Sequence, residues 1–268
     1  MKSKIKKSSP DSRRGEQKFL IIDVGNTTAH FGICSREKIV TRFRIPSIIS
    51  RLRKDVPTAL RKAGALDGAL ISSVVPLLNG TLESLCRRAG IKPIWLNYRT
   101  PTGIRLLYSK PGEIGSDRIA NVAAARELYR VPAIVVDIGT AITFDCISKR
   151  GDYLGGVIAP GPRLSRTALA EHTGLLPFID IARPPHIVGK STKHAIQSGM
   201  IFGARALISG IVGGLRKEMG GRPTVIFTGG QIELIIHGWN YPKIVDPLLT
   251  LQGLRIIYNR IVTTDEHG

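Results

Sequence analysis

Apolar and polar positions along the chain fall into short blocks whose spacing predicts strands, turns and helices. Apolar residues lead up to an Asp at 19–23, a turn follows at 23–28, and a second apolar run covers 29–35. The same order of blocks returns at 133–148. Short apolar runs bounded by turn residues are typical of buried strands. The pattern therefore predicts two strand–turn–strand units.

The two units are near copies of each other at an offset of 114 positions. Asp23 aligns with Asp137 and Gly25 with Gly139. Both copies place two branched apolar residues before the Asp, and both follow the Gly with short hydroxyl-, amide- or methyl-bearing residues. A repeated unit whose first strand ends in a carboxylate indicates two similar half-domains that face a shared polyanion.

The remaining blocks alternate between the spacing of strands and that of helices. Further strands are expected at 38–45, 69–75, 94–96, 153–158 and 224–227, and helices at 58–65, 77–89, 117–129, 163–172, 194–219 and 232–237. Ser116 is expected to cap the helix that follows it. Alternating strands and helices predict an α/β fold. We expect its two halves to comprise residues 19–130 and 131–268.

Length and composition bound the class of protein. The chain has 268 residues, 43% of them hydrophobic, which suffices for one large or two moderate domains. No run of eighteen apolar residues occurs, so no transmembrane helix and no membrane partner are expected. No apolar segment with a cleavage site follows the basic N-terminus, and the three cysteines are widely spaced. These features predict a reducing, cytoplasmic location.

The net charge of +19 changes this picture. Residues 1–18 are polar and basic and predict a disordered tail, but they carry only +5, so +14 remains on the other residues. A basic body favours anionic ligands or nucleic acid, or reflects a saline or acidic habitat. Aromatic residues make up only 6% and do not interleave with basic ones, so no stacking platform for single strands is visible.

The first turn has the chemistry of a phosphate-binding loop. Gly25 lets the backbone approach a phosphate closely, and Asn26, Thr27 and Thr28 add side-chain donors. Asp23, at the end of the strand, is placed to orient a Mg²⁺-bound water beside the phosphates. The alternative is a hairpin whose polar side chains satisfy only their own turn. The second Asp-x-Gly copy favours the functional interpretation.

Another candidate is the segment EIGSDRIA at 113–120. A Gly-Ser turn leads into a helix whose first turn holds Asp117 and Arg118, and free N–H groups there attract anions. Asp117 is placed to accept a proton from a bound hydroxyl, and Arg118 to grip a carboxylate or phosphate. A helix N-terminus lowers the pKa of an Asp, which weakens it as a base, but phosphoryl transfer tolerates this. The alternative is an Asp that stabilises only its own helix.

Two further signals are weak. GKST at 189–192 resembles the end of a P-loop, but Pro184 stands where that motif needs a Gly, so we reject this interpretation. The Gly-rich turns at 155–165 and 228–233 open helices, and each could meet phosphate or ribose or be an ordinary turn.

Taken in order over 19–258, these blocks resemble type III pantothenate kinase, of the acetate kinase/hexokinase/Hsp70/actin superfamily. The matching segments are DVGNT (23–27), Tyr108 before PGEIGSDR (111–118), VDIGTAITFD (136–145), GGVIAPG (155–161), Thr192 before AIQSG (195–199), TGG (228–230) and LTLQGL (249–254). The resemblance implies an α/β fold of two ribonuclease-H-like half-domains with an interdomain cleft, the actin-like ATPase architecture. It also implies ATP-dependent phosphorylation of pantothenate to 4'-phosphopantothenate, the first step of coenzyme A biosynthesis.

The resemblance further implies a role for particular residues. Asp117 falls on the proton-accepting aspartate, and Asp137 on the ligand of a monovalent cation, K⁺ or NH₄⁺. The residues that fall on ATP contacts are Asp23, Val24, Gly25, Asn26, Thr27, Thr28, Ala29, His30 and Thr140. Those that fall on pantothenate contacts are Tyr108, Gly115, Ser116, Asp117, Arg118 and Thr192. Mg²⁺ is expected with ATP, and a homodimer with substrate sites near its interface.

Two other functions stay open at this point. A kinase-related transcriptional accessory factor that binds nucleic acid would explain the basic surplus, but the intact Asp23, Asp117 and Asp137 argue against it. A kinase of the same superfamily that acts on another small hydroxyl compound is the third possibility.

Overall fold

The computed structural model describes residues 17–241 and 244–265, so the predicted disordered tail at 1–18 lies outside the described residues except for its last two positions. Two five-stranded mixed sheets organise the described part of the chain. The first, in the order β3-β2-β1-β4-β5, consists of β1 (Phe19–Val24), β2 (Thr28–Cys34), β3 (Ile39–Pro46), β4 (Ala69–Ser73) and β5 (Pro93–Trp95). The second, in the order β10-β9-β6-β7-β8, consists of β6 (Ala133–Ile138), β7 (Ala141–Ile147), β8 (Tyr153–Pro160), β9 (Thr224–Thr228) and β10 (Ile244–Val245).

The two sheets have one topology. β1 pairs antiparallel with β2 and parallel with β4, and β6 pairs antiparallel with β7 and parallel with β9. The second sheet, read from β8, repeats the order of the first, which confirms the predicted duplication. Asp23 pairs with His30 and Asp137 with Thr143, so each Asp lies one residue before the end of a central strand. The fold thereby brings both carboxylates to the turn edge of their sheets.

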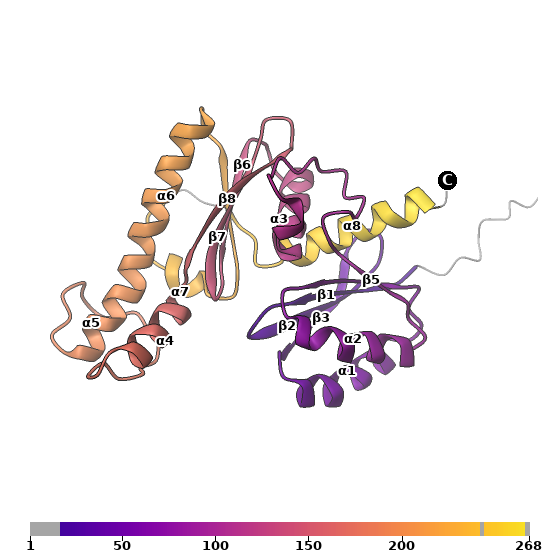
Figure 1. Ribbon diagram of the computed structural model, residues 1–268, viewed down its shortest axis with the longest axis horizontal. Coiled ribbons are helices and arrows are strands. Elements are labelled where there is room, and N and C mark those ends of the chain that lie inside the picture. Colours follow the sequence, from indigo (N-terminus) through magenta and orange to yellow (C-terminus); the bar gives the residue numbers. More distant parts are fainter. Residues whose placement is uncertain (1–16, 242–243, 266–268) are drawn as a thin grey trace, which may run out of the picture.

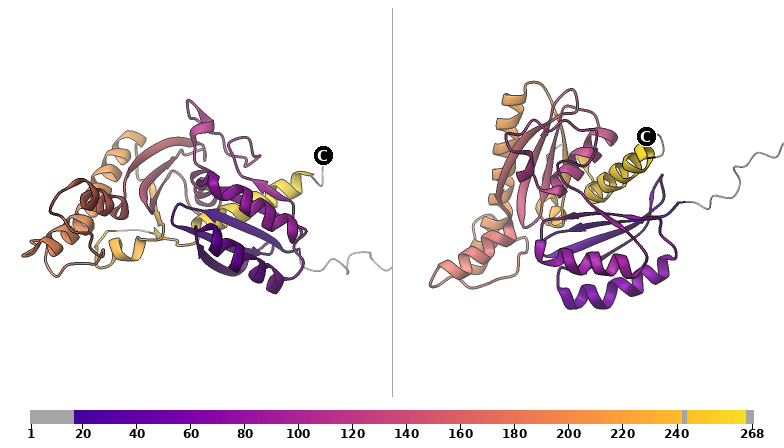
Figure 2. Two further views of the ribbon diagram at one scale, coloured as in Figure 1. Left: turned by 60° about the horizontal axis from the view of Figure 1, so that its bottom comes forward. Right: turned by 45° about the vertical axis from the view of Figure 1, so that its right-hand side comes forward.

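Helices cover both outer faces and fill the space between the sheets (Figures 1 and 2). Their bounds are α1 (Ile49–Ala63), α2 (Pro76–Arg88), α3 (Ser116–Leu128), α4 (Pro162–His172), α5 (Thr192–Ser198), α6 (Ala204–Met219), α7 (Ile232–Ile236) and α8 (Leu249–Asp265), with a 3₁₀ turn at Pro111–Glu113 and a π turn at Gly199–Gly203. Helices α1 and α2 pack on the first sheet, and α6 and α7 on the second. Helices α3 and α8 lie between the sheets.

The α3–α8 pair joins the two halves into one core. Its cluster of buried residues runs from Phe19 and Ile21 of the first sheet to Val135 of the second. The two helices approach so closely at Gly253 that a Cβ there would collide with the carbonyl oxygen of Ala120. Although α8 follows the second sheet in the chain, it also packs against β1, β2 and β4 of the first. The predicted boundary near residue 130 stays a prediction.

Two helices differ from the sequence prediction. Helix α1 begins at Ile49 rather than at residue 58, because Leu52, Val56 and Leu60 bury one face at four-residue spacing even though Pro57 stands inside the helix. The single helix expected at 194–219 is interrupted by the π turn at Gly199–Gly203.

One helical stretch, Thr192–Met219, is long and apolar enough to span a membrane by length and composition. Its second part, α6, buries Ile208 and Val212 against the second sheet. The stretch is therefore a partly buried core helix of the α/β fold. The cysteines Cys34, Cys86 and Cys146 are free and buried, as expected for small apolar side chains.

Candidate active site

Three carboxylates from three elements influence one another where the halves meet. Asp23 stands at the end of β1, Asp137 at the end of β6 and Asp117 in the first turn of α3, and each keeps partial exposure to solvent. Burial raises the pKa of Asp23 to about 8, and the charges of Asp117 and Asp137 add to this. Burial likewise raises the pKa of Asp137 to about 7, with Asp117 contributing. The site is therefore an accessible region of negative potential that favours protons or cations.

Local contacts position Asp117. Its Oδ1 accepts a hydrogen bond from the backbone N–H of Arg118 at 2.8 Å. The sequence argument expected the helix N-terminus to lower the pKa of Asp117, and this was wrong. Burial raises that pKa, and it outweighs the lowering by the Arg118 N–H and guanidinium. Asp117 is thus a better base than its place on the helix predicts.

Ser116 does not cap α3, contrary to the prediction. It is the first helical residue, and Gly115, which has no side chain to cap the helix, precedes it as the cap. Its Oγ lies 3.0 Å from Ser72 Oγ and accepts a hydrogen bond from the Ser73 N–H at 3.0 Å. Ser72 in turn bonds to Asp23 and lowers its pKa. Ser116 therefore ties the start of α3 to the end of β4 and, through it, to β1.

A second chain of hydrogen bonds holds Asp137. Asn121 on α3 donates from Nδ2 to Asp137 Oδ2 at 3.1 Å, and Thr250 on α8 donates to Asn121 Oδ1 at 2.8 Å. Gly229 closes the other side, with φ of +103° and so little space that a Cβ would collide with Asp137 Oδ1. Thr250 and Gly229 lie in segments that match the family pattern, but sequence reasoning assigned a role to none of these three residues.

The two Asp-x-Gly turns face each other. Thr27 Oγ1 of the first lies 3.5 Å from Thr140 Oγ1 of the second. Each turn is closed through its Gly, by Gly25 N–H to Thr28 O at 3.2 Å and by Gly139 N–H to Ala141 O at 2.9 Å. Asn26 and Thr27 are exposed, so their side chains can reach a ligand at this junction.

The other predicted ATP contacts are less exposed to solvent. The side chains of Val24 and Ala29 are fully buried, so only their backbone atoms are available to a ligand. His30 is half-buried beside Asp23 in the sheet. Burial and the nearby Arg44 lower the pKa of His30, which keeps it neutral at pH 7.

Arg118 is turned into the protein. Its Nε donates to Asp145 Oδ1 at 2.7 Å, and Tyr153 OH donates to the same oxygen at 2.9 Å. Tyr108 stacks on Tyr153 with 6.2 Å between ring centroids, so two of the predicted pantothenate contacts share these supports. Asp145 and Tyr153 were missed, although Asp145 ends the matching segment VDIGTAITFD (136–145). No local signal marked either as a partner of Arg118.

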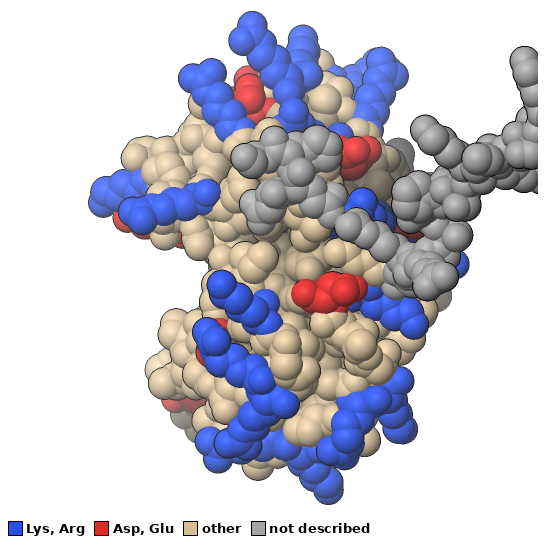
Figure 3. Space-filling view, turned by 90° about the vertical axis from the view of Figure 1, so that its right-hand side faces the viewer, with Lys and Arg blue, Asp and Glu red and all other residues tan. Residues whose placement is uncertain are grey.

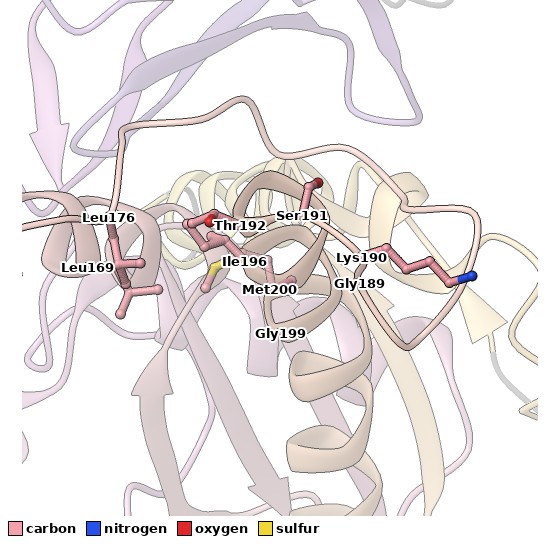
Figure 4. Close-up of a pocket in the computed structure, with 10 residues that line it drawn as sticks. Leu169, Leu176, Gly189, Lys190, Ser191, Thr192, Ile196, Gly199 and Met200 are labelled. Carbon is pink, nitrogen blue, oxygen red and sulfur yellow. The ribbon is translucent and has the colours of Figure 1, made fainter.

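Thr192 is a predicted pantothenate contact that the structure does not bring to the other predicted site residues. It is exposed and lines a pocket of about 660 Å³, in which no carboxylate takes part (Figure 4). The lining residues are Leu169, Leu176, Gly189, Lys190, Ser191, Thr192, Ala195, Ile196, Gly199 and Met200. Ser191 caps α5 by accepting the His194 N–H at 3.2 Å, which explains the GKST segment as a helix start.

The duplicated fold, with acidic residues and two facing Asp-x-Gly turns gathered between its halves, defines a protein of the actin-like ATPase architecture. Two solved structures share it. Ethanolamine utilization protein EutJ from Carboxydothermus hydrogenoformans matches with a TM-score of 0.58 at 16% identity and 92% coverage of both chains. The activator of the 2-hydroxyisocaproyl-CoA dehydratase from Clostridium difficile, with bound ADPNP, matches with a TM-score of 0.54 at 11% identity, covering 94% of this chain and 98% of that one. At these identities the likeness shows the fold alone.

The sequence narrows this class to one family. The model of type III pantothenate kinase matches residues 19–213. The type III pantothenate kinase of Koribacter versatilis is 40% identical over 272 residues, covering 93% of this chain and 99% of the relative. That of Moorella thermoacetica is 39% identical over 251 residues, with 90% and 99% covered.

The chain belongs to the type III pantothenate kinase family. Its activity is therefore that of the family, the phosphorylation of pantothenate in coenzyme A biosynthesis, as the resemblance predicted. This decides against both the accessory factor and the kinase of another hydroxyl compound.

Proposed function

We propose that the chain transfers the γ-phosphoryl group of ATP in line to the primary hydroxyl of pantothenate, with Asp117 as the base. The observation that carries this proposal is the convergence of Asp23, Asp117 and Asp137 from three different elements, where burial and the charge of Asp117 raise the pKa of both other carboxyl groups. Phosphoryl transfer requires mainly positioning and charge stabilisation, and such a group supplies both. The raised pKa of Asp117 supports its role, because a base is most effective when its pKa approaches the working pH.

The same carboxylates fit the cations that this reaction uses. Burial and mutual repulsion disfavour their charged forms, and a bound cation would relieve both. Within residues 17–241 and 244–265 no three His, Cys, Asp or Glu side chains come close enough to hold a metal alone. We therefore expect Asp23 to share Mg²⁺ with ATP oxygens and water, and Asp137 to hold K⁺ or NH₄⁺. When bound, these cations would neutralise phosphate charge.

The turns at 23–30 and at Thr140 are proposed to hold the ATP phosphates. The 3.5 Å approach of Thr27 Oγ1 to Thr140 Oγ1 offers two hydroxyl donors from opposite halves at one point. The Gly25 and Gly139 turns let backbone N–H groups approach as well. A nucleotide bound here would contact both halves at once.

Pantothenate is proposed to lie against Tyr108, Arg118 and the 115–116 turn, on the side of Asp117. Thr192 lines a separate pocket, so we propose that it acts across a homodimer interface, beside the substrate of the other subunit. Large apolar side chains around that pocket support such an interface: Leu175 is 94% exposed, Val188 72% and Phe178 61%.

We propose a cytoplasmic location, which the three free, buried cysteines fit. Nucleic acid is not proposed as a partner. On the face in Figure 3, Lys and Arg side chains lie over both the upper and the lower part of the molecule.

The test is ADP release on addition of pantothenate, with and without K⁺. We expect Asp117→Asn to lower kcat about 10²- to 10⁴-fold. Asp55→Asn is the matched control, because Asp55 pairs with Arg51 at the surface of α1, away from the proposed site. Absence of pantothenate-dependent ADP release from the wild type would contradict the assignment of the reaction. Unchanged turnover in Asp117→Asn would contradict only the role of Asp117.

A further inference from the structure

Arg118 is held by two buried groups that take no part in the proposed reaction. Asp145, on β7, is fully inaccessible to solvent, and Tyr153, on β8, is 1% exposed. Both the Arg118 Nε–H and the Tyr153 hydroxyl donate to one carboxylate oxygen, Asp145 Oδ1. The Arg118 guanidinium also lies over the Tyr153 ring, 5.8 Å from its centroid.

The ion pair between Arg118 and Asp145 leaves a donor unused. An arginine and a carboxylate commonly pair through two parallel hydrogen bonds, but only Nε takes part here. Arg118 Nη2 and, on the other side of the pair, Asp145 Oδ2 are both buried and have no hydrogen-bond partner within the described parts of the chain. A buried charged donor without a partner is unfavourable unless a ligand completes it.

The backbone of β8 packs closely around this donor. Gly156 on β8 packs so tightly that an added Cβ would lie 2.9 Å from Arg118 Nη2 and would collide with the Phe144 carbonyl oxygen. The segment that carries Tyr108 is fixed to the same strand, since Leu107 N–H donates to Tyr153 O at 2.8 Å and Tyr153 N–H to Arg105 O at 3.0 Å. Tyr108 and Arg118, which are ten residues apart in the chain, thus converge on the more distant Tyr153.

We propose that Asp145 and Tyr153 are positioning residues that fix Arg118, whose unpaired Nη2 binds the carboxylate of the substrate. Pantothenate carries one charged group, its carboxylate, and a guanidinium N–H is a matched donor for it. Tyr153 has a second role, because its ring stacks on the Tyr108 ring and holds Tyr108 near Arg118. The inference rests on the proposed function, in which Arg118 contacts pantothenate.

The test compares pantothenate with its alcohol analogue, in which the carboxylate is replaced by CH₂OH, by measuring KM and kcat for both. The wild type is expected to prefer the carboxylate. Tyr153→Phe removes one hydroxyl while the ring that Tyr108 stacks on remains, and it is expected to raise KM for pantothenate several-fold at nearly constant kcat. Asp145→Asn is expected to raise KM about tenfold or more and to erase most of the preference, because the neutral amide no longer holds the guanidinium.

Tyr129→Phe is the matched control. Tyr129 OH also donates to a carboxylate, Asp246 Oδ2 at 2.9 Å, in a network that includes none of the proposed site residues. It should lose a comparable hydrogen bond without a change in the preference between the two substrates. Melting curves of all variants establish that each is folded before the kinetics are compared.

The outcomes separate the inference from the proposal beneath it. If Arg118→Lys leaves KM for pantothenate unchanged, the substrate role of Arg118 is wrong. If Arg118→Lys raises KM but folded Tyr153→Phe and Asp145→Asn keep the wild-type preference for the carboxylate, the positioning role alone is overturned. If Tyr153→Phe and Asp145→Asn instead lower kcat while KM and the preference for the carboxylate stay constant, Arg118 faces the transferred phosphoryl group. That result would also overturn the inference.

Discussion

The hydroxyl oxygens of Thr27 and Thr140 lie 3.5 Å apart, although 113 residues separate the two in sequence. Each belongs to the turn of one copy of the duplicated hairpin. In the proposed function, their approach makes a single phosphate site out of two half-domains, without a P-loop. A ligand that engages both hydroxyls would hold the halves together.

Removing either hydroxyl should weaken ATP binding. We expect Thr27→Val and Thr140→Val each to raise KM for ATP about tenfold, because a hydrogen bond to a charged oxygen contributes ~1.5–3 kcal/mol. The measurement is KM for ATP at saturating pantothenate. Thr41→Val, on the exposed face of β3, is the control and should leave it unchanged. An unaltered KM for ATP in both variants would contradict the proposal that the two threonines contact the phosphates.

Two adjacent glycines offer a second test, at Asp137. Gly229→Ala introduces a Cβ against Asp137 Oδ1 at a φ of +103°, whereas Gly230→Ala meets nothing within 4 Å. We expect Gly229→Ala to lower kcat/KM at least tenfold and to cost ~1–3 kcal/mol of stability, through strain and displacement of the carboxylate. Gly230→Ala should stay near wild type in assay and melting temperature. Equal behaviour of the two variants would mean that the position of Asp137 is not critical.

The hydrogen-bond chain from Thr250 through Asn121 should govern the cation requirement. Asn121 orients Asp137, and Thr250 orients Asn121. We expect Thr250→Val to raise the K⁺ concentration needed for half-maximal activity several-fold, while KM for ATP changes little. The exposed Thr264 on the same helix makes a hydrogen bond only to the Arg260 backbone, so Thr264→Val is the control. A proportional loss of activity at every K⁺ concentration would point to a structural role instead.

The acidic group should make the ligand-free protein less stable as the pH rises. The folded pKa of Asp23 is about 8 and that of Asp137 about 7, both above the ordinary value of 3.8. Between pH 3.8 and these raised pKa values, the folded state binds protons that the unfolded state does not. The free energy of unfolding therefore falls as the pH increases toward 8. Melting temperatures at pH 6 and pH 9 measure this decline.

Asp137→Asn isolates the contribution of one carboxylate to that decline. The variant should lose less stability than the wild type between pH 6 and pH 9, and should melt higher than the wild type at pH 9. The expected difference is ~1–3 kcal/mol, allowing for the partial exposure of the side chain. Identical pH profiles for the two proteins would contradict the raised pKa of Asp137.

Much of the fold was readable from local patterns. Both hairpins, the duplication and most helices follow from the spacing of apolar side chains, because that spacing depends on residues only a few positions apart. Helix α1 was cut short in the prediction because Pro57 masks the regular spacing of Leu52, Val56 and Leu60. The assignment of Ser116 as a cap failed for a different reason: Ser72 and Ser73, far away in sequence, engage its hydroxyl instead.

By itself, the sequence determined the α/β class, the repeated Asp-x-Gly turn, the family and the identity of the three acidic residues. Tertiary structure alone decided how those residues are held and charged. Asn121 meets Thr250 across 129 positions, and Arg118 meets Asp145 across 27, only because α3 packs between the two sheets and beside α8. The pKa of Asp117 also changed direction, from the lowering expected of a helix start to a rise caused by burial. Burial and long-range partners depend on how elements pack, and no local pattern encodes that packing.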